Sequence, residues 1–284
     1  MLTGLILSAE RFAILSSEPS KMTPVLASPT LIDLRTQAQS LGGGRHGEVF
    51  LFEGRVYKAY KERGWLALER EHMIRAGLED WVLDTLDLEG REVLVMRAFD
   101  GVPVTAQTLP SVLEPLHTLL ERTHKANPGV QPVEVNRIAR RLERFRDLTQ
   151  PELEPLFEEV ETALLEGTFH APTAFCHLDL WADNVLVSTS GQALVIDWVR
   201  AGWDDPMRDI ALFKSGTLDL LEPENSLDAL RPYIHSPTEQ KRLRSYLALT
   251  YLHDIHWLTH NEPGSLEVQY PLKLERGLAA LEGL

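Results

Sequence analysis

The segment from Cys176 to Trp198 constrains the fold of this chain more than any other part of it. It reads C-H-L-D-L-W-A-D-N-V-L-V-S-T-S-G-Q-A-L-V-I-D-W. Two short apolar runs, 185–187 and 193–196, flank a turn-like stretch with a glycine, and this pattern predicts a β-hairpin. In an antiparallel pair, the residues that flank the two strands lie side by side at the open end. We therefore expect Asn184 and Asp197 to be neighbours.

The polar side chains at that end of the hairpin suit a magnesium site. An amide oxygen and a carboxylate are hard ligands of the kind that Mg²⁺ shares with substrate phosphates. Asp179, five residues before Asn184 on an expected irregular loop, would lie near the ion and could meet a substrate hydroxyl without being a ligand itself. A lone D-x-x-x-x-N is more simply a solvated acidic surface, but three positions in register with a hairpin weaken that reading. The pattern indicates phosphoryl transfer.

A second motif lies far upstream, where residues 41–49 read L-G-G-G-R-H-G-E-V. Gly42, Gly44 and Gly47 fit G-x-G-x-x-G-x-V, the pattern of a glycine-rich loop that covers the phosphates of ATP. Glycine permits a tight approach of the backbone that a Cβ atom would block. Clustered glycines alone more often mark a turn, so the flanking elements matter.

Those flanking elements predict a small sheet with one helix. Lys58 stands in an expected strand at 55–60, from which its ammonium could reach phosphates as a point charge. Good helix formers fill 65–76, and this expected helix carries Glu69 and Glu71, either of which could pair with Lys58. If the glycine-rich motif did not precede it, the simpler interpretation of Lys58 would be an ordinary exposed lysine on a strand. Further strands are expected at 49–52, 86–88 and 92–96.

Taken together, these motifs resemble the protein-kinase-like fold and, within it, the aminoglycoside phosphotransferase family of small-molecule kinases. The resemblance runs from about residue 41 to the C-terminus. It implies an α+β, bilobal fold with a small antiparallel-sheet N-lobe containing one helix and a larger, mostly helical C-lobe. The expected parts are an extension at 1–40, an N-lobe at 41–96, a linker at 97–101 and a C-lobe at 102–284.

The resemblance also implies roles for the residues around the hairpin. His177, Asp179 and Asn184 match the family's H-x-D-x-x-x-x-N catalytic loop, and Asp197 matches its metal-binding aspartate. Asp179 would then orient the acceptor hydroxyl and accept its proton, while Asn184 and Asp197 would hold Mg²⁺. His177 would brace the loop.

For the nucleotide, ATP or GTP, the resemblance implies a second set of residues. Lys58 matches the phosphate lysine, and Glu71 in R-E-H matches the acidic partner of that lysine, which makes Glu71 the preferred partner. Met96 and Ala98 fall in the segment between the lobes, where the backbone binds adenine.

Departures from the protein-kinase pattern favour the small-molecule branch. Trp181 stands where protein serine/threonine kinases carry lysine, and the chain has no A-P-E. Residues 202–209, G-W-D-D-P-M-R-D, are instead similar to the family's G-D-P-x-x-D. Asp205 is expected to cap a helix that Pro206 begins. By resemblance, Asp209 orients the catalytic loop. Leu178 stands where many relatives have glycine.

Two other readings stay open besides a small-molecule kinase that uses a hydroxyl acceptor. One is a protein serine/threonine kinase-like enzyme, and the other is a nucleotide-binding pseudokinase. Transfer of label to proteins but not to small hydroxyl compounds would favour the first. Stabilisation by nucleotide without turnover would favour the second. All the required polar groups are present, so an active enzyme is preferred.

The last third of the chain should choose the acceptor. Trp203, Asp254 and Glu262 are candidates for contacting a polyhydroxylated or cationic substrate. The expected helix at 241–260 places three histidines on one face. Packing or a solvated face is preferred to a zinc site, because the order is not H-E-x-x-H and no cysteine assists. The three histidines on this face are His253, His256 and His260. After this helix, a loop is expected at 261–264.

Charge and composition exclude several partners. The formal net charge is −14, which argues against nucleic acid, because phosphate backbones call for clustered Lys and Arg. It is compatible with a cationic acceptor. No apolar run approaches the roughly 20 residues that span a bilayer, so no membrane partner is expected. The oligomeric state is left open.

A single cysteine, Cys176, rules out an internal disulfide and suits a cytoplasmic protein. The apolar run at 5–7 is too short for a signal-peptide core, and no basic residue precedes it. Met22 is a candidate translational start, in which case residues 1–21 would not be part of the native protein.

Overall fold

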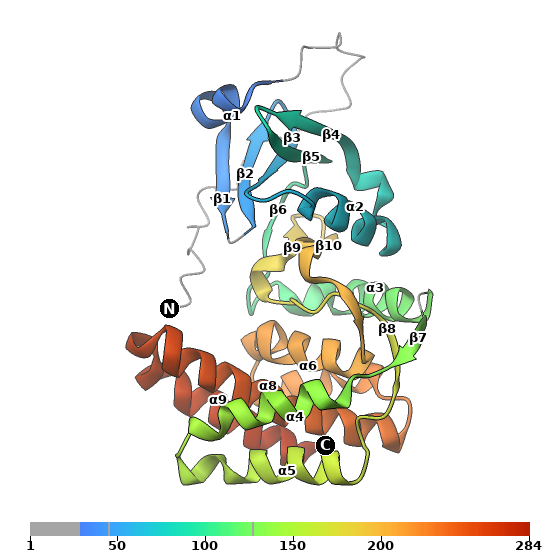
Figure 1. Cartoon of the computed structure of the whole chain (residues 1–284), viewed down its shortest axis with the longest axis vertical. Helices are drawn as coiled ribbons and strands as arrows, with labels where there is room; N and C mark the ends of the chain where they lie inside the picture. The colour runs from blue at the N-terminus through green and yellow to red at the C-terminus, as the bar shows by residue number, and fades with distance from the viewer. Residues whose placement is uncertain (1–28, 45, 127) are drawn as a thin grey trace. The chain divides into compact units, whose positions relative to one another are not determined.

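The computed structural model describes residues 29–44, 46–126 and 128–284. The chain divides into two compact units (Figure 1), each taken here by itself. Among the described residues, the N-terminal unit comprises 29–102 together with 197–200, and the C-terminal unit comprises 103–196 and 201–284. The expectations for residues 1–21 and for Met22 fall outside the described part of the chain.

The N-terminal unit is built on one five-stranded sheet of order β1-β2-β3-β5-β4, in which every neighbouring pair is antiparallel (Figure 1). Two of its hairpins turn on the dipeptide Glu-Gly, and both residues of each turn have positive φ. Two-residue turns of this kind match the twist of the strands that they join. The strands are β1 (Gln39–Gly43), β2 (Gly47–Phe52), β3 (Arg55–Tyr60), β4 (Val82–Leu88) and β5 (Arg91–Arg97).

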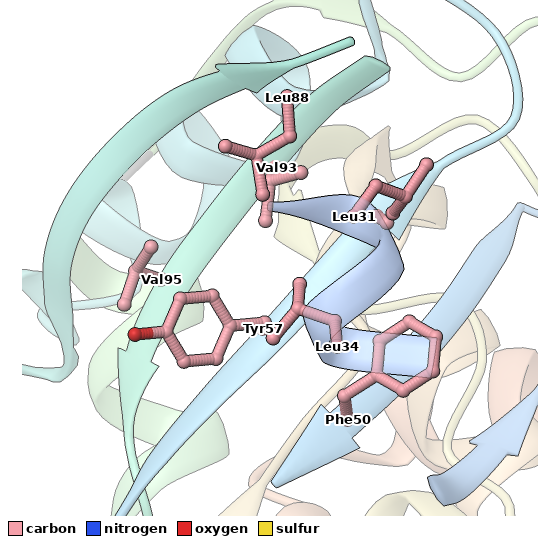
Figure 2. Close-up of a cluster of buried hydrophobic side chains, with 8 residues drawn as sticks. Leu31, Leu34, Phe50, Tyr57, Leu88, Val93 and Val95 are labelled. Atoms are coloured by element: carbon pink, nitrogen blue, oxygen red, sulfur yellow. The ribbon is translucent and has the colours of Figure 1, made fainter. Parts of the chain in front are cut away.

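One face of this sheet packs against a helix that the sequence did not predict, α1 (Leu31–Gln37). Leu31 and Leu34 contact Tyr57 and its neighbours in the buried cluster that Figure 2 shows. Thr30 and Asp33 form a reciprocal capping box, which starts the helix. The expected extension at 1–40 is therefore wrong at its C-terminal end, because residues from Thr30 onward belong to the core of this unit.

The opposite face carries Lys58 and Tyr60, since side chains alternate along β3. Helix α2 (Trp65–Arg75) lies beside the short helical turn Trp198–Arg200, and His72 Nδ1 is 2.8 Å from the Trp198 carbonyl oxygen. That contact joins a segment from late in the chain to the N-terminal unit.

The C-terminal unit is mostly helical, and its core is formed around α8 (Pro237–Asn261), which has twelve buried residues. This helix packs against α5, α6 and α9. The other helices are α3 (Leu113–Ala126), α4 (Val135–Arg144), α5 (Glu154–Leu165), α6 (Pro206–Gly216), α7 (Pro223–Asp228) and α9 (Pro263–Gly283). The strands beyond β5 are β6 (Gly101–Pro103), β7 (Pro128–Pro132), β8 (Pro172–Cys176), β9 (Val185–Ser188), β10 (Ala193–Val195) and β11 (Gly202–Asp204).

The expected hairpin is present as β9 and β10, but its register differs by one residue from the expectation. Val185 pairs with Val195, and the Asn184 carbonyl accepts a hydrogen bond of 2.9 Å from the Ile196 N–H. Asn184 is therefore opposite Ile196, and Asp197 is the next residue along the chain. The expected strand at 193–196 was one residue too long.

The α+β class is confirmed: an antiparallel sheet dominates the N-terminal unit and helices dominate the C-terminal one. Over the described residues, no helix is both long enough and apolar enough to cross a membrane. The expected loop at 261–264 is reduced to one residue, because α8 ends at Asn261, α9 begins at Pro263 and only Glu262 lies between them.

Candidate active site

Lys58 lies at the centre of a buried charge network in the N-terminal unit. Its Nζ is 2.7 Å from Glu69 Oε2 and 2.8 Å from Asp197 Oδ1. The Tyr60 hydroxyl donates to Glu69 Oε2 at 2.6 Å. Burial lowers the pKa of the Lys58 ammonium, but the two carboxylates outweigh it, so the pKa lies above its usual range. Lys58 is thus held as a fixed positive charge.

The prediction that Glu71 pairs with Lys58 is wrong. Glu71 points to solvent, with 62% of its side chain exposed, and its carboxylate is 3.0 Å from Arg75. Glu69, His72 and Met73 are the buried residues of α2, at the i, i+3 and i+4 spacing of one helix face. Two residues further along a helix, Glu71 lies on another face. The apolar Met73 was the sequence signal that could have selected Glu69.

The glycine-rich turn joins β1 to β2. Gly42 has a φ of +125°, which is the region that favours glycine. A Cβ atom on Gly47 would lie 2.4 Å from the Ala59 carbonyl oxygen, so only glycine fits beneath β3 there. The Gly44 N–H donates to the Gly47 carbonyl at 2.9 Å, and Lys61 Nζ donates to the Gly44 carbonyl at 2.8 Å. The result is a backbone turn with the Lys61 ammonium beside it.

The two residues expected at the adenine lie at the end of β5. Met96 is half-buried and pairs with Val56 of β3, and Ala98 follows the strand and is exposed. Phe99 packs edge-on against Trp81, with ring centroids 5.7 Å apart.

In the C-terminal unit, Asp209 holds by its backbone the loop 177–184, which is the expected catalytic loop. Its two carboxylate oxygens accept from the His177 N–H at 3.0 Å and from the Leu178 N–H at 2.7 Å. His124 Nε2 of α3 is 3.0 Å from Asp209 Oδ2. Asp209 is fully buried, and burial raises its pKa. The bonds and charge of His124, with smaller contributions from His177 and Leu178, outweigh burial and leave the pKa below its usual range.

These two bonds precede an unusual backbone conformation at position 178. Leu178 has a φ of +63°, a conformation that is costly for a residue with a Cβ atom. Asp209 accepts hydrogen bonds from the N–H groups of the two consecutive peptides that lead into Leu178, and so it holds the backbone just before this residue. The loop thus adopts, with a leucine, a backbone geometry that glycine would adopt freely, directly after the segment that the buried carboxylate holds.

His177 and Asn184 set the orientation of the loop that carries Asp179. His177 Nε2 donates to the Ile196 carbonyl at 3.0 Å, so its Nδ1 accepts from the Asp179 N–H at 3.3 Å. Asn184 Nδ2 donates to the Asp179 carbonyl at 2.8 Å, which assigns the amide and turns Oδ1 away from that carbonyl. With this assignment, Oδ1 is the acceptor atom of the Asn184 amide.

The donor types of Asn184 and Asp197 fit magnesium. Asn184 offers an amide oxygen and Asp197 offers a carboxylate, and each is an oxygen ligand of the hard type that Mg²⁺ prefers. Asp197 has a φ of +61° and directs Oδ1 to Lys58.

Asp205 caps α6, as expected from the sequence. Its Oδ1 accepts from the Met207 N–H at 2.9 Å, and Pro206 begins the helix. Arg242 Nε is 2.9 Å from Asp205 Oδ2, although the two atoms are not aligned as a hydrogen bond. Burial raises the pKa of Asp205 to about 6, against the opposing charge of Arg242.

The three residues expected at the acceptor differ in accessibility. The Trp203 side chain is 46% exposed and meets Phe175 edge-on. Asp254 is only 5% exposed and forms an ion pair of 2.9 Å with Lys273, so its placement does not support contact with a substrate. Glu262 is half-buried at the junction of α8 and α9.

Two supporting contacts were not predicted from the sequence. Tyr60 bonds Glu69, and His124 bonds Asp209. Tyr60 lies two residues after Lys58 on the same strand, so the alternation of side chains could have predicted that both lie on one face. His124 acts across 85 positions of sequence, and no local pattern indicates that contact.

Comparison with solved structures places the fold. An aminoglycoside phosphotransferase APH(4)-Ia, in a ternary complex with ADP and hygromycin B, is 16% identical with a TM-score of 0.62, covering 87% of this chain and 94% of that one. An aminoglycoside 2'-phosphotransferase-IIIa in complex with GDP is 13% identical with a TM-score of 0.61, covering 85% and 92%. A choline/ethanolamine kinase family protein from Mesorhizobium loti is 20% identical with a TM-score of 0.59, covering 90% and 95%.

At these identities the likeness establishes the fold alone. A search of curated proteins found no match. The family model for the phosphotransferase enzyme family, however, matches residues 61–246, which is well over half of the chain and includes the loop 177–184 and the hairpin of β9 and β10. The chain therefore belongs to the phosphotransferase enzyme family, and it is a phosphotransferase that acts on a hydroxyl group.

Proposed function

We propose that this protein transfers the terminal phosphoryl group of ATP or GTP to a hydroxyl of a small molecule. The observation that carries the proposal is the bonding of the catalytic loop. Asp209 fixes its backbone, and Asn184 donates its amide to the Asp179 carbonyl, so that one carboxylate and one amide oxygen are presented on the same loop.

Within this proposal, Asp179 orients the acceptor hydroxyl and takes its proton as the phosphoryl group leaves the nucleotide. General bases of this kind contribute about 10²–10⁴-fold to rate. His177 and Asp209 act as positioning residues, because their contacts are to the backbone of the loop. Because the transition state of phosphoryl transfer is loose, the protein contributes mainly by positioning the reactants and by stabilising the charge on the phosphoryl oxygens.

The phosphates of the nucleotide are assigned to Lys58 and the glycine turn. Glu69 keeps the Lys58 ammonium charged, and that charge offsets the charge on phosphoryl oxygens. Asn184 and Asp197 are assigned to Mg²⁺, which when bound neutralises phosphate charge. Met96 and Ala98 are assigned to the base. Complexes of neighbouring structures with ADP, AMP-PNP and GDP support a nucleotide as donor without choosing between ATP and GTP.

A small acceptor is supported by Trp181, which replaces the lysine of protein kinases. The ammonium of Lys273 lies 5.6 Å from the centroid of the Trp181 ring, so this position is occupied by an aromatic–cation contact. The net charge of −14 suits a cationic acceptor such as an aminoglycoside or amino alcohol. Trp203, exposed at 46%, is the best-placed of the three candidate acceptor contacts. A cytoplasmic location is part of the proposal, and the proposed nucleotide donor and the single buried thiol support it.

The test is nucleotide consumption with Mg²⁺ against a panel of aminoglycosides, amino alcohols, sugars and peptides, each with ATP and with GTP. We expect stoichiometric phosphorylation of at least one small hydroxyl compound, identified by mass spectrometry. Phosphorylation of peptides or proteins in preference to every small compound would overturn the choice of acceptor. Nucleotide binding with no turnover on any acceptor would overturn the activity.

A further inference from the structure

A second cluster of polar side chains lies in the C-terminal unit, apart from the catalytic loop. Asp147 ends the short helical turn 145–147 after α4, and His256 and His260 lie one turn apart on α8. His260 Nε2 is 3.0 Å from Asp147 Oδ2, and His256 Nε2 is 3.5 Å from Asp147 Oδ1. The two imidazole rings stack, with centroids 4.3 Å apart.

The tautomer of His260 makes this arrangement informative. His260 Nδ1 is 2.8 Å from the His256 carbonyl oxygen, which can only accept, so Nδ1 carries a hydrogen. In the neutral ring, Nε2 then presents a lone pair to a carboxylate oxygen 3.0 Å away. Two acceptors in contact repel each other. A positive species, either a proton on Nε2 or a metal cation, must lie between them.

The spacing of the donor atoms fits a metal. Zinc bonds of about 2.0–2.2 Å to imidazole and carboxylate in a tetrahedral site put ligand atoms about 3.3 Å apart. His260 Nε2 lies 3.0 Å from Asp147 Oδ2, and His256 Nε2 lies 3.5 Å from the other oxygen, Oδ1. One ligand atom from each of the three residues lies within 4.8 Å of the other two. Histidines at i and i+4 share a helix face, as in H-E-x-x-H.

The support around the ligands also fits. Histidines that bind a metal typically donate their other ring N–H to a carbonyl or carboxylate, and His260 donates Nδ1–H to a carbonyl. The His256 ring packs on Phe145, which is 1% exposed and fixes that imidazole against the core. His253, the third histidine of the same helix, contacts Asp254 instead.

We propose that Asp147, His256 and His260 form a divalent transition-metal site, with zinc as the best-fitting ion. Three protein ligands leave a fourth position for water, and the ligands are accessible: the Asp147 side chain is 48% exposed and that of His260 is 46% exposed. The ion would tie the turn after α4 to α8. This site does not depend on the proposed phosphoryl transfer.

The test is titration of metal-stripped protein with Zn²⁺ by isothermal calorimetry, in buffer with excess Mg²⁺ to occupy oxygen-ligand sites. We expect one Zn²⁺ per chain with a Kd in the micromolar range or below. His256→Ala, His260→Ala and Asp147→Asn should each weaken binding by at least about 100-fold, since loss of even a supporting partner costs 10–100-fold. His253→Ala, a histidine of the same helix, is the matched control and should bind as the wild type does.

A second measurement uses the wild-type protein alone and so does not depend on variants that fold. Co²⁺ substituted at the site should give the intense visible absorption of a tetrahedral centre, and added Zn²⁺ should abolish it. A Kd weaker than millimolar, a Co²⁺ spectrum like that of the aqueous ion, or equal binding by His253→Ala and His260→Ala with both reduced would overturn the proposal. Each of those outcomes would leave a protonated His260–Asp147 ion pair as the explanation.

Discussion

Replacing Glu69 with glutamine should damage the N-terminal unit severely, whereas the same change at Glu71 should be almost silent. Lys58 is 7% exposed and Glu69 is 2% exposed, so their ion pair is shielded from water. Removing one partner of a buried pair costs about 3–5 kcal/mol, because the other charge is left buried. Asp197 remains on Lys58, and a glutamine oxygen can still accept from Tyr60.

These two compensations place the expected loss at the lower end, about 3 kcal/mol, or about 150-fold in the folding equilibrium. For Glu71, the exposed i, i+4 pair with Arg75 sets the loss at about 0.3–0.5 kcal/mol. The two variants make the same chemical change two residues apart on one helix, so they separate the position from the substitution.

Urea denaturation gives the change in the free energy of unfolding for both variants. Amide hydrogen exchange of peptides from β3 and α2 reports on this unit alone. Faster exchange of these peptides is expected in Glu69→Gln and wild-type exchange in Glu71→Gln. A Glu69→Gln protein within 0.5 kcal/mol of wild type, or a Glu71→Gln protein equally destabilised, would refute the assignment of the lysine partner.

Three further outcomes are expected. Gly47→Ala should lower the free energy of unfolding, measured by heat or urea, by at least about 1–3 kcal/mol, because its Cβ would lie 2.4 Å from the Ala59 carbonyl oxygen. Gly44→Ala has open space around it and should keep wild-type stability. Equal losses in the two variants would contradict this prediction. The folded-state pKa of Asp205, about 6, exceeds its ordinary value of 3.8, so the folded state binds this proton more tightly than the unfolded state does. Lowering the pH from 7 to 4.5 should therefore stabilise the wild type by about 2 kcal/mol relative to Asp205→Asn. Curves of unfolding free energy against pH that run parallel for the two proteins would contradict this prediction. EDTA should abolish phosphoryl transfer and excess Mg²⁺ should restore it, with activity in EDTA as the contrary result.

The sequence predicted those parts of the molecule that depend on short-range patterns. Turn residues between β-branched runs gave the hairpin of β9 and β10, and the cap at Asp205 followed from one dipeptide. The hairpin register was off by one residue, since the apolar Ile196 resembles a strand residue although β10 ends at Val195. In α2, the resemblance suggested Glu71, while the burial face of the helix selects Glu69.

Contacts between distant segments were beyond prediction. Asp147 approaches His260 only because the turn after α4 packs on α8, and nothing near either residue signals the other. Helix α1 is only seven residues long, and two buried leucines decide its place on the sheet. Helix α8 was expected at 241–260 and spans Pro237–Asn261, but its burial on several faces was not expected.

Turnover of Asp179→Asn measured beside Asp183→Asn tests the central claim most directly. Both are aspartates of the same loop region, and Asp183 is exposed. With an acceptor from the panel, Asp179→Asn should lower kcat by about 10²–10⁴-fold while the KM for nucleotide changes little, and Asp183→Asn should keep nearly wild-type kcat. Wild-type turnover by Asp179→Asn would contradict the account.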